Sequence, residues 1–92
     1  MNEKLLEKKL RESVKKLGGI ALKFTSPFYT GMPDRIILMP NSKTYFAEMK
    51  TTGKKATPLQ LERIKMLTGL GFDAKVIDSQ ESLNQFLKDI KC

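Results

Sequence analysis

The sequence predicts one α/β domain over residues 1–92, with the element order αβββαβα. Three observations support this fold class. Apolar residues recur at helical spacing in three segments, short apolar runs typical of strands lie between them, and glycines and prolines mark the junctions. The length suits a single domain, because domains cluster at about 100–150 residues.

The first third of the chain predicts a helix, a strand and a loop. The helix covers residues 3–17, with Asn2 as its N-cap and Gly18-Gly19 after its last turn. Residues 20–24 are expected to form a short strand, and residues 25–33, which hold two prolines and a glycine, a loop. The apolar stripe of the helix consists of Leu6, Leu10, Val14 and Leu17.

The middle third predicts a β-hairpin followed by a basic loop. Apolar segments at residues 34–39 and 44–50 flank the turn-forming segment Pro40-Asn-Ser-Lys43, which is a hairpin pattern. Residues 51–56 are polar and include the pair Lys54-Lys55. This segment is therefore expected to be a positively charged loop.

The last third predicts a helix, a strand and a final helix. Thr57-Pro-Leu-Gln60 has the pattern of a capping box with proline in the first turn, and this helix should end at Gly69 or Gly71. A strand is expected within residues 73–78, and Ser79 should cap the final helix. The apolar face of that helix consists of Leu83, Phe86, Leu87 and Ile90.

Composition excludes several classes of protein. The chain has 40% hydrophobic residues and a net charge of +7, which predicts a folded domain with a basic surface. No apolar stretch approaches the ~20 residues of a membrane span, and no signal-peptide core is present. The single cysteine, Cys92, cannot form an internal disulfide, which fits a cytoplasmic location.

The sequence contains no histidine. Its absence excludes Ser-His-Asp and Cys-His nucleophiles, histidine-zinc sites and nucleases with a histidine base. Any chemistry must therefore come from carboxylates, lysines, hydroxyls and a bound metal.

Three carboxylates lie beside or within apolar segments and not in the polar segments expected at the surface. Glu7 borders the apolar stripe of the first helix, about 60° from Leu10 at ~100° per residue. Asp34 follows Pro33 at the entrance of an apolar strand, and Glu48 lies within the partner strand. Because buried carboxylates are costly unless they are paired or hydrogen-bonded, these three are candidate site residues.

The hairpin brings Asp34 and Glu48 to the same end of the strands. With a loop over residues 40–43, Asp34 lies opposite Met49, between Glu48 and Lys50. A loop one residue shorter or longer, or a bulge, places Asp34 on the same face as Glu48. In each case two carboxylates and an ammonium converge, which suits a hard cation with oxygen ligands such as Mg²⁺.

This charge pattern predicts phosphodiester hydrolysis without a covalent nucleophile. The carboxylates would hold the cation, while the cation and Lys50 would neutralise a pentacovalent phosphate that water attacks. The absence of histidine agrees with such a mechanism.

The same residues resemble a known nuclease motif. Pro33-Asp34, thirteen further residues and then Glu48-Met49-Lys50 look like the PD-(D/E)xK motif. The wider pattern resembles the virus-type replication-repair nuclease (VRR-NUC) family, over almost the whole chain. Its matching blocks are Glu7, Gly18-Gly19, Lys23-Phe24, Gly31-Met-Pro-Asp-Arg35, Phe46-Ala-Glu-Met-Lys50 and Gln60.

The resemblance implies a restriction-endonuclease-like αβββαβ core with a C-terminal helix and a mixed sheet flanked by helices. It also implies DNA cleavage that depends on Mg²⁺ or Mn²⁺. Asp34, Glu48 and the main-chain carbonyl of Met49 would ligate the metal, and Glu7 would add a carboxylate to the metal or its water shell.

The resemblance assigns further roles by position. Lys50 would be the catalytic lysine, and Gln60 would orient Lys50 or the scissile phosphate. The candidate DNA contacts are Lys23, Arg35, Lys54 and Lys55. Because the chain resembles stand-alone phage and bacterial members, we expect a homodimer that resolves four-way (Holliday) junctions in a bacterial or phage-infected cell.

Simpler interpretations remain open for several of these residues. Glu3, one turn earlier, could replace Glu7, which could then pair with Arg11. A capping box alone would explain Gln60. Phe28 and Tyr29, in the loop over residues 25–33, could stack on a base or belong to the core.

The remaining single-residue alternatives are also structural. Asp34 could be an ordinary strand-entry residue, and Glu48 with Lys50 an ordinary surface ion pair. The cationic face of the first helix could be merely solvated or could follow a nucleic-acid backbone. It consists of Lys4, Lys8, Arg11 and Lys15.

Two rival functions remain open at this point. The first is a non-catalytic basic DNA-binding module of the same fold. The second is a metal-dependent ribonuclease, because neither the motif nor the charge distinguishes the two sugars.

Overall fold

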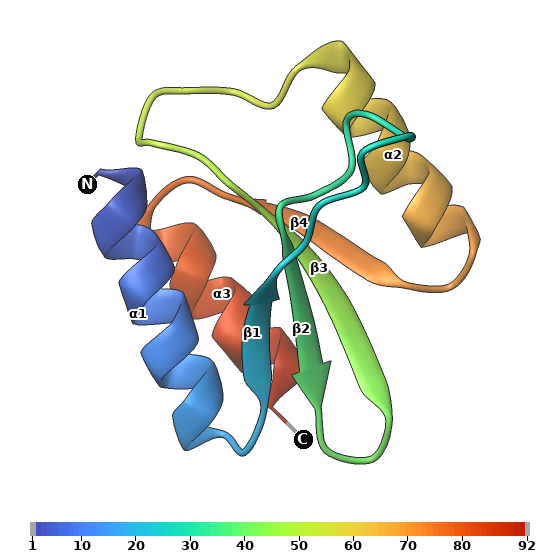
Figure 1. The fold of residues 1–92 in the computed structure, drawn as a ribbon. Coiled ribbons are helices and arrows are strands. Elements are labelled where there is room, and N and C mark those ends of the chain that lie inside the picture. The colour runs from blue at the N-terminus through green and yellow to red at the C-terminus, as the bar shows by residue number, and fades with distance from the viewer. Residues whose placement is uncertain (1, 92) are drawn as a thin grey trace.

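The structure is a computed structural model that describes residues 2–91 (Figure 1). The elements follow the predicted order αβββαβα. They are α1 (Glu3–Lys16), β1 (Ile20–Lys23), β2 (Arg35–Met39), β3 (Lys43–Met49), α2 (Pro58–Gly69), β4 (Asp73–Ile77) and α3 (Gln80–Ile90). None of the described helices is long and apolar enough to span a membrane.

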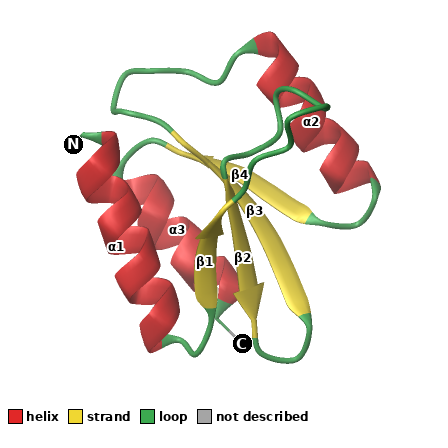
Figure 2. Cartoon of the chain, in the orientation of Figure 1, coloured by secondary structure: helices red, strands yellow, loops and turns green. Residues whose placement is uncertain are grey.

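The strands form a mixed four-stranded sheet in the order β1-β2-β3-β4. β1, β2 and β3 pair antiparallel, whereas β4 pairs parallel to β3 after a crossover through α2. In Figure 2, α1 and α3 cover one face of the sheet and α2 covers part of the other. The predicted mixed sheet flanked by helices is confirmed.

Side-chain caps fix the starts of all three helices. The Asn2 side chain accepts a hydrogen bond from the Leu5 N–H, at 2.8 Å, as the sequence predicts for α1. The Thr57 cap is also confirmed, and its hydroxyl accepts from the Gln60 N–H. Ser79 caps α3 in the same way. α2 ends at Gly69, one of the two predicted ends.

Two hydrophobic cores lie on opposite faces of the sheet. The larger core packs the apolar stripes of α1 and α3 against the sheet, and it includes Leu6, Leu10, Ile37, Met49, Ile77 and Phe86. The smaller core lies under α2, and its buried members are Phe46, Leu67 and Ala74. Strand alternation separates the two sets, because successive side chains point to opposite faces.

The hairpin loop differs from the expected four residues. Met39 pairs with Lys43, so the loop comprises residues 40–42 and is one residue shorter. Asn41 and Ser42 adopt left-handed conformations, with φ of 66° and 62°. This conformation is rare outside glycine but accessible to Asn, and it turns the chain tightly enough for Lys43 to join the ladder.

Candidate active site

The shorter hairpin loop determines how Asp34 and Glu48 lie. β2 and β3 pair Arg35 with Ala47, and one further step in this register places Asp34 opposite Glu48. This is the alternative register, and the two carboxylates lie close enough for Asp34 to raise the pKa of Glu48. The Asp34 Oδ1 accepts a hydrogen bond from the Met49 N–H, at 3.0 Å, and this bond fixes the aspartate at the end of the sheet.

The first turns of α1 bring two more carboxylates to this end. Oxygen atoms of Glu3, Glu7 and Asp34 all lie within 4.8 Å of one another. Glu3 and Glu7 share a helix face because they are four residues apart. The structure thus places both helix glutamates beside Asp34 and does not select one of them.

Arg35 partly neutralises this acidic cluster. Its Nη2 donates to the Glu7 Oε1 at 3.3 Å, and Arg35 is only 5% exposed. Its Nε is buried and, among the described residues, has no hydrogen-bond partner. Arg35 therefore lies inside the molecule next to Glu7, and not on the surface where its expected contact with DNA would require it.

Lys50 lies beside Glu48 on the other side of the site. Its Nζ is 3.5 Å from the Glu48 Oε2, and the lysine side chain is more exposed than the glutamate. The Lys50 N–H donates to the Ile77 carbonyl at 2.9 Å, which continues the β3–β4 pairing and fixes the backbone here. The ammonium is thus held at the open side of a buried carboxylate.

Burial and mutual repulsion disturb the titration of both central carboxylates. The pKa of Glu48 rises from its ordinary value of 4.5 to about 7, first because of burial and then because of the nearby Asp34; Lys50 opposes this rise. The pKa of Asp34 also rises, chiefly through burial, with smaller contributions from the α1 glutamates and opposition from the Met49 N–H. The site therefore has more carboxylate than its cations neutralise.

The donor set fits a divalent cation with oxygen ligands. Mg²⁺ and Ca²⁺ bind oxygen at about 2.0–2.6 Å, so ligands on opposite sides of one ion are about 4–5 Å apart. The oxygens of Glu3, Glu7 and Asp34 already lie within that range. Asp34 and Glu48 have raised pKa values, and a bound cation would lower them.

Gln60 takes part in the capping box. Its Oε1 accepts a hydrogen bond from the Thr57 N–H at 2.8 Å, so the side-chain oxygen stabilises the start of α2. Its part in the capping box thus explains by itself why a glutamine stands at this position. A role in orienting Lys50 stays a prediction.

The other candidate DNA contacts lie on the surface around this end of the sheet. Lys23 is the last residue of β1, pairs in register with Arg35 and is exposed. Lys54 and Lys55 are exposed in the loop that follows β3. Lys23 thus lies opposite the residue that follows Asp34 in the chain, and the DNA contacts of all three lysines stay a prediction.

Sequence reasoning missed the contact between Arg35 and Glu7. Strand alternation was the available signal, because Arg35 has the same phase as Ile37 and Met39, which face α1. An arginine on that face needs an acidic partner from the helix, and Glu7 borders the apolar stripe. The expected alternative pairing of Glu7 with Arg11 is not the one observed.

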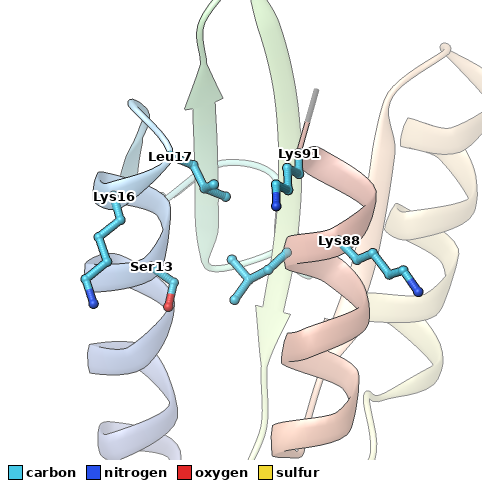
Figure 3. A pocket seen from close by; sticks show the side chains of 6 residues that line it. Ser13, Lys16, Leu17, Lys88 and Lys91 are labelled. Carbon is cyan, nitrogen blue, oxygen red and sulfur yellow. The ribbon is translucent and has the colours of Figure 1, made fainter.

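A separate depression lies at the opposite end of α1. It opens between the C-terminal ends of α1 and α3 (Figure 3), and its lining consists of Ser13, Lys16, Leu17, Leu87, Lys88 and Lys91. α1 is about 21 Å long at 1.5 Å per residue, and Glu3 and Glu7 lie in its first turns. This depression is therefore not part of the acidic site.

The αβββαβα fold and the acidic end of its sheet are those expected of a VRR-NUC domain. The family model of the VRR-NUC domain matches residues 1–81, so the chain belongs to this family. The resemblance expected from the Pro33-Asp34 and Glu48-Met49-Lys50 blocks is thereby confirmed.

Individual relatives agree with this assignment. The chain is 46% identical over 81 residues to a protein named "Putative nuclease p44" from Acyrthosiphon pisum secondary endosymbiont phage 1, covering 88% of this chain and 87% of that protein. It also resembles a solved VRR-NUC domain structure with a TM-score of 0.87 and 24% identity, over 96% of each chain. The structural likeness confirms the predicted fold.

Proposed function

We propose that this protein is a divalent-metal-dependent endonuclease that hydrolyses DNA phosphodiester bonds. The observation that supports this most strongly is the meeting of Asp34, Glu48 and Lys50 at one end of the sheet. Membership of the VRR-NUC family and the name of the phage relative agree with it.

Each side chain has a distinct task in this proposal. Asp34, Glu48 and the Met49 carbonyl hold a Mg²⁺ or Mn²⁺ ion, and Glu7 or Glu3 adds a carboxylate. When bound, the ion supplies neutralising charge and an acidified water. The Lys50 ammonium, 3.5 Å from Glu48, faces the phosphate and stabilises the negative charge that develops in the transition state.

The charge of the chain suits a polyanionic substrate. The net charge is +7 even though the site itself is acidic, so cations are concentrated elsewhere on the surface. The exposed cations at the end of β1 and in the loop after β3 would contact phosphates on either side of the scissile bond; they are Lys23, Lys54 and Lys55.

We further propose a two-fold homodimer that cuts four-way DNA junctions with paired incisions. The described residues 2–91 form one acidic site, so symmetric cuts on two strands need two copies. The sheet face that α2 covers in part has an exposed apolar stripe on β1 and β2, which consists of Ile20, Leu22 and Leu38. Ile20 pairs with Leu38 in register. This apolar stripe supports association with a second copy of the chain.

A panel of substrates and ions tests the nuclease proposal. Branched, duplex and single-stranded DNA and the matching RNAs are incubated with Mg²⁺, Mn²⁺ or EDTA. We expect metal-dependent cleavage of DNA that EDTA abolishes. Cleavage of RNA alone would favour the ribonuclease, and binding without cleavage would favour the non-catalytic module.

Sedimentation and junction mapping test the dimer separately. We expect twice the mass of one chain, and nicks at equivalent positions on opposing strands of a junction. Ile20→Lys should yield a monomer that nicks only one strand, whereas Leu5→Lys, at an exposed apolar position on α1, should remain dimeric. A wild-type monomer that nicks only flaps would contradict the dimer but not the nuclease.

A further inference from the structure

The loop over residues 25–33 is anchored beside a site carboxylate. The Phe24 N–H donates a hydrogen bond to the Asp34 carbonyl at 2.8 Å, so the two ends of the loop meet at the edge of the acidic site. A compact surface loop whose ends lie close together is an Ω-loop, a kind of loop that is frequently functional. The position of Asp34 is thus coupled directly to the base of this loop.

Contacts with α2 hold the loop in place. The Arg63 guanidinium lies 3.9 Å from the centre of the Tyr29 ring, and its Nε donates to the Thr30 carbonyl at 2.9 Å. The Tyr29 hydroxyl donates to the Met66 Sδ at 3.3 Å. In Figure 1 the loop between β1 and β2 accordingly leans over α2.

Glycine permits the close approach of the loop to α2. Gly31 has φ of 87°, and a Cβ atom on it would lie 2.7 Å from the Leu59 Cγ. Such a contact is too short for any side chain at this position unless the loop or the Leu59 side chain moves. The loop is therefore packed against the helix and presents its tip in a defined place.

The tip of the loop is a tight turn that holds the Phe28 ring fully in solvent. The Tyr29 N–H donates to the Ser26 carbonyl at 3.2 Å, so Pro27 and Phe28 are the two central residues of a β-turn. Proline fixes its own φ and suits the first central position. Phe28 is 100% exposed, which excludes the expectation that it belongs to the core.

The surroundings of this ring indicate what kind of molecule it contacts. The segment 25–33 contains no charged residue, and Phe28 lies between Pro27 and Tyr29. Tyr29 already has a guanidinium over its ring, which leaves Phe28 as the free ring of the loop. One isolated ring is a small contact for a protein partner but matches the face of one nucleobase.

We propose that Phe28 stacks on an unpaired base of the DNA and so favours DNA with a gap, a flap or an unpaired base at a branch point. This inference rests on the proposed nuclease function. Base–aromatic stacking is tolerant of sequence because every base has a π-face, whereas an intact duplex keeps its bases stacked on each other. The residue would therefore select DNA structure and not DNA sequence.

Fluorescence and affinity measurements test the stacking. A 2-aminopurine is placed at the unpaired position of a gapped duplex, with Ca²⁺ in place of Mg²⁺. Wild type and Phe28→Trp should quench the fluorophore, and Phe28→Ala should not. Phe28→Ala should also bind the gapped DNA about 5- to 150-fold more weakly, the loss of one stacked base, with less change on intact duplex.

A matched control removes an exposed apolar side chain elsewhere. Leu70 is 68% exposed at the end of α2, so Leu70→Ala should quench and bind like wild type. If Phe28→Ala binds gapped DNA as tightly as wild type does, the proposal that Phe28 stacks on a base is wrong. This holds even if wild type cleaves DNA. If Phe28→Ala instead changes only the sedimenting mass, the ring is a subunit contact and the inference is also overturned.

The two proposals fail in different measurements. Absence of metal-dependent cleavage by wild type would refute the nuclease, and it would leave the quenching experiment to judge the stacking independently. Quenching that is equal in wild type and Phe28→Ala would refute the stacking in every case.

Discussion

The Arg35 Nη2 lies 3.3 Å from the Glu7 Oε1, and this ion pair joins the first residue of β2 to the second turn of α1. Because Glu7 also lies beside Glu3 and Asp34, the guanidinium is the cation that offsets the repulsion within this cluster. The pair therefore links the position of α1 to the geometry of the acidic site.

Arg35→Met should lower the free energy of unfolding by about 1–3 kcal/mol in the absence of metal, because Glu7 loses a charged hydrogen bond and three carboxylates remain together. Chemical denaturation in EDTA measures the loss. Arg35→Met combined with Glu7→Gln should lose less than the sum of the single changes. Additive losses would show that the two residues do not interact.

Lys75→Met provides the control for this experiment. Lys75 pairs with Asp73 at 3.5 Å, but both side chains are largely solvent-accessible. Exposed ion pairs contribute about 0–1 kcal/mol, so this variant should remain close to wild type.

Asp34→Asn, Glu48→Gln and Lys50→Ala should each abolish cleavage and leave DNA binding largely intact. The first two changes remove metal ligands and the third removes a transition-state cation, whereas the basic surface is unchanged. Cleavage assays and binding titrations on the same preparations separate the two effects. Full activity of Glu48→Gln in the presence of metal would overturn the site assignment.

Gln60→Ala and Thr57→Ala separate capping from catalysis. Each removes one half of the capping box and should cost about 0.5–2 kcal/mol of stability. Only Gln60→Ala also removes the amide that is predicted to orient Lys50 or the phosphate. We expect a larger drop in kcat for Gln60→Ala; equal kcat values would restrict Gln60 to its role as a cap.

Mg²⁺ or Mn²⁺ should raise the melting temperature. A ligand bound only by the folded protein stabilises it by about 2.7 kcal/mol at a free concentration ~100 times its dissociation constant. Thermal unfolding with and without metal measures this gain, and Asp34→Asn combined with Glu48→Gln should remove it. An unchanged shift in that double variant would place the ion elsewhere.

Without metal, the protein should become less stable as pH rises from about 4.5 to about 7. The folded-state pKa of Glu48 is about 7 and the ordinary value is 4.5, so the folded state binds the extra proton in this window. The destabilisation is absent below this window and complete above it. Denaturation midpoints in EDTA at several pH values measure it.

Glu48→Gln should flatten this pH profile, because the substituted amide does not titrate. Asp34 shifts in the same direction and should leave a smaller residual slope. A profile that is as steep in Glu48→Gln as in wild type would assign the titration to another group.

The element order and the helix caps could be predicted because they depend on local patterns. Asn2, Thr57 and Ser79 each satisfy backbone donors within three residues of themselves, so their roles are readable from neighbouring positions. The conjunction of Asp34, Glu48 and Lys50 was predictable too, because a hairpin brings its two outer ends together.

The exact register and the partner of Arg35 were less accessible. The register depends on left-handed conformations at Asn41 and Ser42, where glycine would have been the usual signal. The Arg35–Glu7 contact depends on how α1 lies across the sheet, which is a long-range packing property. Loop length and helix docking are thus the two quantities that local patterns left open.

The two cores described above differ in the number of buried residues that the helices contribute to them. α1 and α3 each contribute three buried residues to theirs, whereas α2 contributes Leu67 alone to the other. Segments with few buried contacts open locally at lower free-energy cost. Glu48 lies on the sheet face that carries the smaller core under α2. This part of the site should therefore open locally without opening of the part that contains Glu7. Amide hydrogens of α2 would then exchange with solvent while those of α1 remain protected.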